Sequence, residues 1–280
     1  MKMMNKLKNI QLIALDIDGT SMNSNSEITE YTRNVIQRLA NKYVVVPTTG
    51  RGFYKLREKI LKVENIRYVI SANGAVVTDG LKNKRLFEFL IPYKVAAKIA
   101  DKYTREDTFV YIHRNDECST HVFGCLNKEF YENNLKRDFK TDYKDLDIVD
   151  LYDYILKDQR NVLKIGIRFK SQCDLDIAKQ NIERSFPEVN VFEVGNIGLE
   201  ITEKLASKKD SLEKLCTHLN VDTSNVLAIG DNGNDVEMLK WAGVGVAMKN
   251  AVVQAKEVAN FICEDNDHDG AAHFLEEFLL

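Results

Sequence analysis

Short, unbroken apolar runs alternate with helical segments at both ends of this chain, and this pattern constrains its fold more than any other feature. Near the N-terminus we expect strands at 11–18, 43–49 and 67–73, separated by helices at 29–40 and 53–62. The helices have apolar residues at helical spacing, whereas the strands are apolar throughout. Strands without polar alternation are covered on both faces, which is typical of a parallel sheet with helical crossovers.

The same alternation returns near the C-terminus. The expected helices are 211–219, 236–241, 251–258 and 271–280, and the expected strands are 226–230, 244–248 and 261–263. Because both ends follow one pattern, we predict that residues 1–83 and 199–280 together form one α/β core with a Rossmann-like parallel sheet.

The middle of the chain departs from this order. We expect short strands at 75–78, 85–89, 108–114, 119–123, 162–169, 189–194 and 199–202. We expect helices among them at 92–103, 128–137 and 174–186. The stretch 138–159 is ambiguous. We therefore predict that residues 84–198 form an inserted, mixed α+β cap domain, with boundaries near 82–84 and 197–198.

Charge and composition exclude several classes of protein. The 280 residues contain 39 Lys and Arg against 42 Asp and Glu, a formal net charge of −3, so no basic field is available for nucleic acid. The apolar runs are far shorter than the roughly 20 residues that span a bilayer, so no membrane partner is expected. The five cysteines are scattered, which favours reduced thiols and a cytoplasmic location. Nothing in the sequence specifies an oligomeric state.

Two acidic residues, Asp16 and Asp18, stand at the end of the first strand. Open α/β sheets bind ligands at the carboxyl ends of their parallel strands, and this spacing lets both carboxylates face one crevice. Gly19 and Thr20 allow a tight turn whose amides can meet an anion. Two acids that close an apolar strand are costly unless they are solvated or used in chemistry, so simple capping of a loop is the weaker interpretation.

Two further segments carry groups suited to a phosphate. Thr49 and Gly50 follow the second strand, where a hydroxyl and a backbone N–H can bind an anion together, although a plain helix cap is the alternative. Lys208 and Lys209 stand at the start of a helix, where the helix dipole disfavours cations. A bound anion would explain one of these lysines, and a solvated surface pair is the alternative.

A third segment, 230–235, follows another buried strand and reads Gly-Asp-Asn-Gly-Asn-Asp. Asp231 and Asp235 are one helical turn apart, so both carboxylates can lie near one site. Carboxylate and amide oxygens without His or Cys suit a hard cation, and Mg²⁺ in particular where phosphate is present. Taken together, the polar residues at these strand and helix ends indicate a functional site more specifically than any one motif does alone.

In combination, these motifs resemble the haloacid dehalogenase-like superfamily, in its Cof-type branch of sugar-phosphate phosphatases. The first motif, DxDGT, corresponds to Asp16–Thr20, the second-motif hydroxyl to Thr49, the motif lysine to Lys208, and the last motif, GDxxND, to Gly230–Asp235. Two other segments resemble turns of this branch, 71–75 and 248–251. The resemblance extends in order over essentially the whole chain.

The resemblance implies a phosphatase that acts on small phosphorylated metabolites through an aspartyl-phosphate. Asp16 would attack phosphorus, and Asp18 would protonate the leaving alcohol and later deprotonate water. The implied phosphate-binding residues are Thr49, Gly50, Lys208 and Asn234. The implied ligands of Mg²⁺ are Asp16, the main-chain carbonyl of Asp18, Asp231 and Asp235. The cap would contact the rest of the substrate, and its candidates are His113, Arg114 and His121.

Two alternatives to a hydrolase stay open at this point. A phosphotransferase or phosphomutase would share the nucleophile and exclude water from the second step. A catalytically silent binder of phosphometabolites would lack turnover, although the intact set of site residues argues against it. The chain departs from the family pattern at Lys209 and Lys249, which replace the usual glycines and bear on substrate access.

Overall fold

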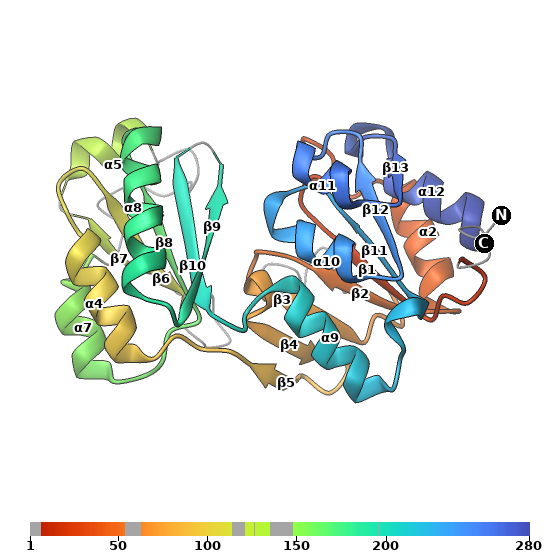
Figure 1. Cartoon of the computed structure of the whole chain (residues 1–280), viewed down its shortest axis with the longest axis horizontal. Coiled ribbons are helices and arrows are strands. Elements are labelled where there is room, and N and C mark those ends of the chain that lie inside the picture. Colours follow the sequence, from red (N-terminus) through yellow and green to blue (C-terminus); the bar gives the residue numbers. More distant parts are fainter. Residues whose placement is uncertain (1–6, 54–62, 114–120, 126, 135–147, 196) are drawn as a thin grey trace. The chain divides into compact units, whose positions relative to one another are not determined.

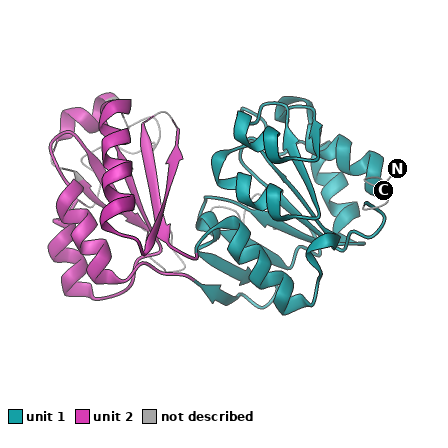
Figure 2. Cartoon of the chain, in the orientation of Figure 1, with its two compact units in different colours: residues 1–88, 206–280 teal, residues 89–205 magenta. Residues whose placement is uncertain are grey.

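The computed structural model describes residues 7–53, 63–113, 121–125, 127–134, 148–195 and 197–280. The chain divides into two compact units, shown in Figure 2. One unit combines Met1–Glu88 with Ala206–Leu280, and the other is Phe89–Leu205. The first is called the core and the second the cap.

The core contains an eight-stranded sheet in the order β13-β12-β11-β1-β2-β3-β4-β5 (Figure 1). Its strands are β1 (Leu12–Asp16), β2 (Val44–Thr48), β3 (Tyr68–Ser71), β4 (Val76–Asp79), β5 (Lys84–Glu88), β11 (Val226–Gly230), β12 (Val244–Met248) and β13 (Phe261–Cys263). The strands from β13 to β3 pair in parallel, and β4 and β5 extend the sheet by antiparallel pairing. The parallel core sheet agrees with the predicted fold class, and its strands come from both ends of the chain.

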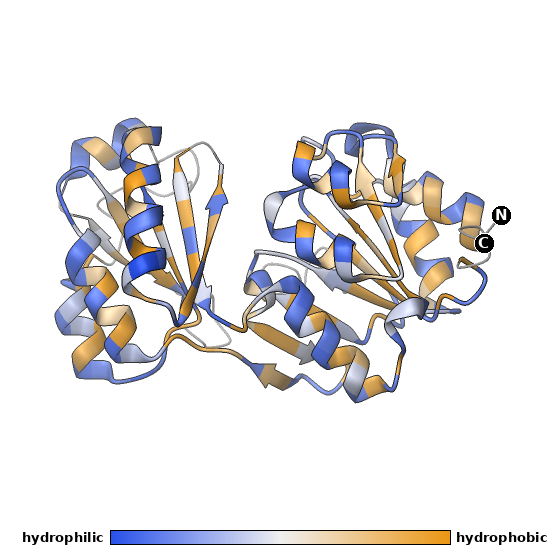
Figure 3. Cartoon of the chain, in the orientation of Figure 1, coloured by the Kyte–Doolittle hydropathy of each residue, from blue (hydrophilic) through white to orange (hydrophobic). Residues whose placement is uncertain are grey.

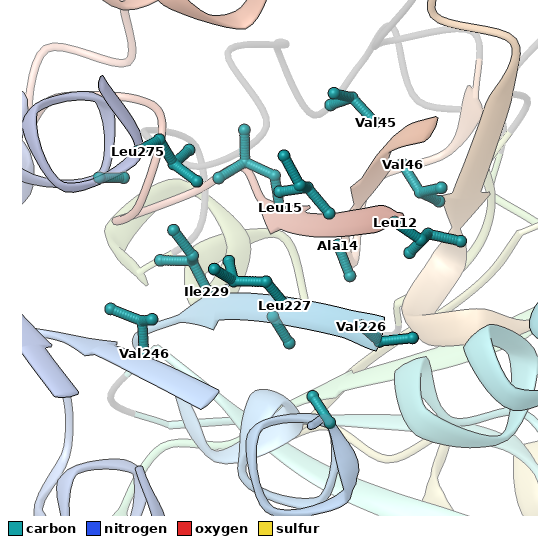
Figure 4. Packing of buried hydrophobic residues seen from close by; sticks show 14 of the residues in the cluster. Leu12, Ala14, Leu15, Val45, Val46, Val226, Leu227, Ile229, Val246 and Leu275 are labelled. Carbon is teal, nitrogen blue, oxygen red and sulfur yellow. The ribbon is translucent and has the colours of Figure 1, made fainter. Parts of the chain in front are cut away.

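Apolar side chains on both faces hold this sheet in place. Every residue of β1, β11 and β12 is buried, as the unbroken apolar runs predicted. Figure 4 shows side chains of β1, β2, β11 and β12 packed together with Leu275. The core helices are α2 (Glu30–Ala40), α9 (Lys208–Leu219), α10 (Val236–Trp241), α11 (Val253–Val258) and α12 (Gly270–Leu279). Helix α2 packs against α12, and α10 packs against α9 and α11.

The cap has its own five-stranded, fully antiparallel sheet in the order β7-β6-β8-β10-β9. Its strands are β6 (Phe109–His113), β7 (His121–Cys125), β8 (Lys164–Arg168), β9 (Val189–Val194) and β10 (Gly198–Glu203). Its helices are α4 (Tyr93–Tyr103), α5 (Lys128–Asn134), α7 (Leu151–Asp158) and α8 (Gln172–Ser185), banded in hydrophilic and hydrophobic residues in Figure 3. Part of the ambiguous stretch is therefore helical, as α7.

The units divide after Glu88 and Leu205 instead of after residues 83 and 198. Strand β5 pairs with β4, so residues 84–88 belong to the core sheet. Strand β10 pairs with β8 and β9, so residues 199–203 belong to the cap sheet. Hydrophobic pattern alone cannot say which sheet a strand joins, and this is why the predicted boundaries differ.

Some predicted elements fall outside the described residues. Residues 54–62 of the helix expected at 53–62 and the candidate Arg114 are among them, and the side chain of His121 is not described. Helix α9 begins at Lys208, three residues earlier than expected, because the Ser207 side chain caps it by accepting from the Asp210 N–H at 2.9 Å. No helix in the described part of the chain is both long and apolar enough to cross a bilayer.

Candidate active site

Three neighbouring strands of the core sheet end where the predicted site residues stand. Strand β1 lies between β2 and β11, and all three run in the same direction. Asp16 is the last residue of β1, Thr49 follows β2 directly, and Asp231 follows β11. The strand order therefore gathers residues from distant parts of the sequence at one edge of the sheet, as expected for an open α/β fold.

Lys208 connects the first and last motifs. Its Nζ lies 2.5 Å from Asp16 Oδ1 and 2.7 Å from Asp235 Oδ1, and all three side chains are buried. Burial by itself would lower the pKa of Lys208, but the two carboxylates outweigh it and raise that pKa above its ordinary value, so the ammonium stays charged. In the structure, this lysine at a helix start is paired with two carboxylates, and its predicted contact with an anion stays a prediction.

The carboxylates of this cluster repel one another. Burial and then the nearby Asp235 raise the pKa of Asp16 well above its ordinary value, although Lys208 opposes the shift. Burial and Asp235 likewise raise the pKa of Asp231 to about 6. The single positive charge of Lys208 therefore does not cancel the negative charges of the nearby carboxylates.

Hydrogen bonds set the position of the two acids in the last motif. Asp231 Oδ1 accepts from Thr20 Oγ1 at 2.9 Å. Asp235 Oδ2 accepts from the backbone N–H groups of Asp231 and Asn232, at 3.2 and 3.0 Å. Gly19 has a φ of 77°, and a Cβ there would lie 2.5 Å from Asp231 Oδ2. Only glycine therefore allows Asp231 to approach the first-motif turn this closely.

The acid cluster has the donor chemistry of a metal site. Asp16, Asp231 and Asp235 each offer a carboxylate oxygen, and these oxygens lie within 4.8 Å of one another. Oxygen donors with excess negative charge suit a hard divalent cation, which would relieve the repulsion that raises the pKa values of Asp16 and Asp231. The residues present therefore fit such an ion.

Asp18 has a different environment from Asp16. Its side chain is 45% exposed, whereas that of Asp16 is 5% exposed. The Arg51 guanidinium holds the Asp18 carboxylate with two nitrogens: Nε donates to Oδ2 at 2.9 Å and Nη2 pairs with Oδ1. Thr49 Oγ1 also donates to Asp18 Oδ2, at 3.4 Å. The first-motif acids thus differ in both burial and partner.

Thr49 and Gly50, two of the predicted phosphate contacts, lie in the turn after β2. Thr49 is fully buried, and its Oγ1 accepts from the Arg51 N–H at 3.0 Å. Gly50 lies between these two residues. Asn234 Nδ2 donates to Asn73 Oδ1 at 3.0 Å, which links the last motif to the turn after β3.

Comparison with known proteins identifies the family. A sequence profile of haloacid dehalogenase-like hydrolases matches residues 13–275. The chain belongs to this family. YxeH of Bacillus subtilis (strain 168) is 29% identical over 278 residues, which cover 96% of this chain and 98% of YxeH. YcsE of the same organism, named 5-amino-6-(5-phospho-D-ribitylamino)uracil phosphatase, is 28% identical over 276 residues, with 97% of this chain and 96% of YcsE covered.

A solved structure of the same superfamily has the same fold. BT1666 from Bacteroides thetaiotaomicron superposes with a TM-score of 0.82 at 22% identity, covering 96% of this chain and 95% of BT1666. This likeness confirms the predicted fold class. The family match and the phosphatases among the relatives make this chain a phosphatase of the haloacid dehalogenase-like family.

The two lysines that depart from the family pattern point to surface carboxylates. Lys209 Nζ donates to Glu213 Oε2 at 2.6 Å and to Asp210 Oδ1 at 3.1 Å. Lys249 Nζ donates to Glu264 Oε2 at 2.9 Å, and both of these side chains are well exposed. In these contacts, neither ammonium group pairs with an acid of the cluster around Lys208.

Several residues make side-chain contacts in the site that sequence reasoning did not assign. Arg51 and Thr20 hold the carboxylates of Asp18 and Asp231. Asn250 Nδ2 donates to the Gly19 carbonyl at 2.9 Å. Each of these residues stands inside or beside a recognised motif, and that position was the available signal. Their partners, however, are set by the fold.

Proposed function

We propose that this phosphatase hydrolyses small phosphorylated metabolites, such as sugar phosphates, with Mg²⁺ and through an aspartyl-phosphate on Asp16. The observation that carries the proposal is the group of Asp16, Asp231 and Asp235, in which the buried Asp16 and Asp235 pair with the Lys208 ammonium. Buried like charges are unfavourable, and their concentration in one place is typical of functional sites. The relative YcsE, whose name includes a phosphorylated small molecule, supports the substrate class.

Asp16 is the proposed nucleophile. One carboxylate oxygen attacks phosphorus, the bond from phosphorus to the leaving oxygen breaks, and an acyl phosphate forms. Lys208, at 2.5 Å from Asp16 Oδ1, offsets the repulsion between the carboxylate and an anionic phosphate. Water then attacks phosphorus, which releases inorganic phosphate and restores the carboxylate.

Asp18 is the proposed acid and base. It gives a proton to the leaving oxygen in the first step and takes one from water in the second. Its half-exposed carboxylate suits both tasks better than the buried Asp16 does. The Arg51 guanidinium contacts both oxygens of the Asp18 carboxylate, so substrate binding has to displace that contact before Asp18 can reach the leaving oxygen.

Thr49, Gly50, Lys208 and Asn234 are the proposed phosphate contacts. The Thr49 hydroxyl is buried directly after β2 and the Lys208 ammonium is buried at the start of α9, and each is proposed to contact an oxygen of one phosphoryl group. The Asn234 side-chain amide has two N–H donors. One of them donates to Asn73 Oδ1, and the second is not used in that bond. The cap is proposed to contact the non-reacting part of the substrate.

Asp16, Asp231 and the main-chain carbonyl of Asp18 would hold Mg²⁺, with Asp235 in support. When bound, the ion would neutralise negative charge on the phosphoryl oxygens and on Asp16. Both oxygens of Asp235 already accept hydrogen bonds, from Lys208 on one side and from backbone N–H groups on the other. Asp235 therefore supports the ion mainly by orienting Asp231 and Lys208.

The proposal is tested by the release of inorganic phosphate from para-nitrophenyl phosphate. Turnover should require Mg²⁺, stop with EDTA and be absent in Asp16→Asn. Full turnover in excess EDTA would contradict the metal assignment. Transfer of the phosphoryl group to an added alcohol, in preference to water, would favour the phosphotransferase alternative. A panel of phosphorylated sugars, nucleotides and cofactors, ranked by kcat/KM, would then define the substrate. The predicted cytoplasmic location stays a prediction.

A further inference from the structure

The turn between β3 and β4 has an unusual backbone. Ala72, Asn73 and Gly74 are three consecutive residues with positive φ, at 52°, 57° and 96°. Asparagine and glycine enter this left-handed region readily, but for alanine it is a strained conformation. Such strain persists where the surrounding structure enforces it, and it is frequent near functional sites. We call residues 72–74 the left-handed turn.

The left-handed turn holds the Thr49 segment from one side. The Ala72 N–H donates to the Arg51 carbonyl at 2.8 Å, and the Asn73 N–H donates to the Thr49 carbonyl at 3.0 Å. These two bonds bracket Gly50. The main chain that carries the proposed phosphate-binding hydroxyl and amide is therefore fixed to this turn.

The same turn also holds the start of α9. Gly74 O accepts a hydrogen bond from Ser211 Oγ. A Cβ on Gly74 would lie 2.1 Å from the Ser207 carbonyl oxygen, so the backbone of the helix start packs directly on this glycine. The turn consequently fixes the first residue of α9, which is Lys208.

A third contact reaches the last motif. Asn73 is fully buried, and its Oδ1 accepts from Asn234 Nδ2 at 3.0 Å. Asn234 Oδ1 is itself buried and has no hydrogen-bond partner among the residues that the structure describes. The Asn73 side chain thus orients an amide whose remaining polar atom is left for another group.

We propose that Asn73 is a positioning residue for phosphoryl transfer. Through the left-handed turn it sets the separation of Thr49, Lys208 and Asn234, which come from three distant parts of the sequence. It acts through these three residues and not by contact with phosphate. The inference rests on the proposed function, because these residues are the proposed phosphate contacts. Small errors in such separations reduce the rate steeply, by about 10²-fold for a 1 Å displacement.

The test compares Asn73→Gly with a matched control, Asn65→Gly. Asn65 is also left-handed, with φ 67°, and its Nδ2 donates to Asn41 Oδ1 at 2.8 Å. It precedes β3, whereas Asn73 follows that strand, so it lies away from the carboxyl ends of the sheet. Glycine keeps the left-handed backbone accessible in both variants, so each loses one amide–amide hydrogen bond.

Two quantities are measured in the presence of Mg²⁺: kcat/KM for para-nitrophenyl phosphate, and the inhibition constant of orthovanadate, a mimic of the transition state. Asn73→Gly should lower kcat/KM by about 10- to 100-fold and should raise the inhibition constant of orthovanadate by about tenfold or more. Asn65→Gly should change both by less than about twofold. An inhibition constant does not depend on the fraction of folded enzyme, so lost stability cannot imitate the expected result.

Equal effects of the two glycine variants on orthovanadate inhibition would overturn the proposal. If Asn73→Gly does not fold, Asn73→Ser provides the same comparison, because its shorter side chain cannot keep the Asn234 contact. Failure of the proposed function has a different signature. It would appear in the unaltered enzyme, as turnover without Mg²⁺ or as turnover that survives Asp16→Asn, before any variant of Asn73 is measured.

Discussion

The core and the cap each contain a buried lysine paired with a carboxylate. In the core, Lys208 lies 2.5 Å from Asp16 and 2.7 Å from Asp235. In the cap, Lys164 lies 2.6 Å from Glu200, on adjacent strands of the antiparallel sheet. The lysine side chains are 1% and 3% exposed, so the depth of burial does not distinguish the pairs.

The balance of charge does distinguish them. In the core, Asp16 and Asp235 both pair with one lysine, and the carboxylates of Asp16, Asp231 and Asp235 lie within 4.8 Å of one another. No comparable group of three ligating side chains occurs in the described residues of the cap. A buried ion pair whose two charges cancel needs no ligand. A group of acids with excess negative charge is unfavourable unless a cation binds there or the acids take part in catalysis. Excess charge, and not burial alone, therefore indicates the site.

The largest expected effect comes from removing the nucleophile. Asp16→Asn keeps the shape of the side chain and removes its charge, so kcat should fall by about 10⁴-fold or more. The variant should stay folded, because one repulsive charge leaves the cluster. Phosphate release and thermal unfolding measure both properties. A well-folded variant that keeps a tenth of the rate would contradict covalent catalysis.

The two lysines should respond differently to the same substitution. Lys208→Met should lower kcat by about 10²- to 10³-fold, because it removes the positive charge beside the phosphoryl group. Lys164→Met should instead destabilise the protein by about 3–5 kcal/mol, because Glu200 is left buried without this partner. Its kcat for para-nitrophenyl phosphate should change little.

Chemical denaturation and steady-state kinetics separate these outcomes. The double variant Lys164→Met/Glu200→Leu is the control, since replacing both charges should recover much of the lost free energy of unfolding. If Lys164→Met abolished turnover in folded protein, the cap pair would belong to the chemistry and the contrast with the core would fail.

Loss of a proposed metal ligand should be a smaller effect. Asp231→Ala should raise the Mg²⁺ concentration needed for half-maximal rate by about tenfold or more, because the remaining oxygens bind the ion less well. Asp222→Ala is the matched control, since Asp222 caps a short helical turn in the same unit through Ser224. Titration of the rate with Mg²⁺ measures the difference, and equal curves for the two variants would count against the assignment.

The smallest effect is expected in the pH dependence of the metal-free protein. The pKa of Asp231 is raised from 3.8 to about 6, so the folded state binds this proton more tightly than the unfolded state. Its contribution to stability is therefore lost as the pH rises from about 4 to about 6. In EDTA, Tm should be a few degrees higher at pH 5 than at pH 7.5, and Asp231→Asn should flatten this difference. Mg²⁺ should raise Tm more at pH 7.5 than at pH 5, because protons and the ion compete for the same oxygens.

Much of the core followed from local pattern. The apolar runs of β1 and β11 and the acids that close them are short-range features, so the sequence was enough to expect Asp16 and Asp231 at strand ends. The cap boundaries were less predictable, because the apolar patterns of β5 and β10 do not indicate which sheet each strand joins. Only pairing with β4, or with β8 and β9, decides their unit.

The sequence by itself determined the fold class, the insertion of a cap and the residue types at the site. The tertiary structure decided which of these residues meet: Lys208 reaches Asp16 across 192 positions, and Asn234 reaches Asn73 across 161. It also decided that Arg51 holds Asp18 while Asp16 is buried beside a lysine. The physical reason is that strand and helix patterns arise from neighbouring residues, whereas ion pairs and amide contacts depend on strand order and side-chain direction. Those are properties of the folded chain alone.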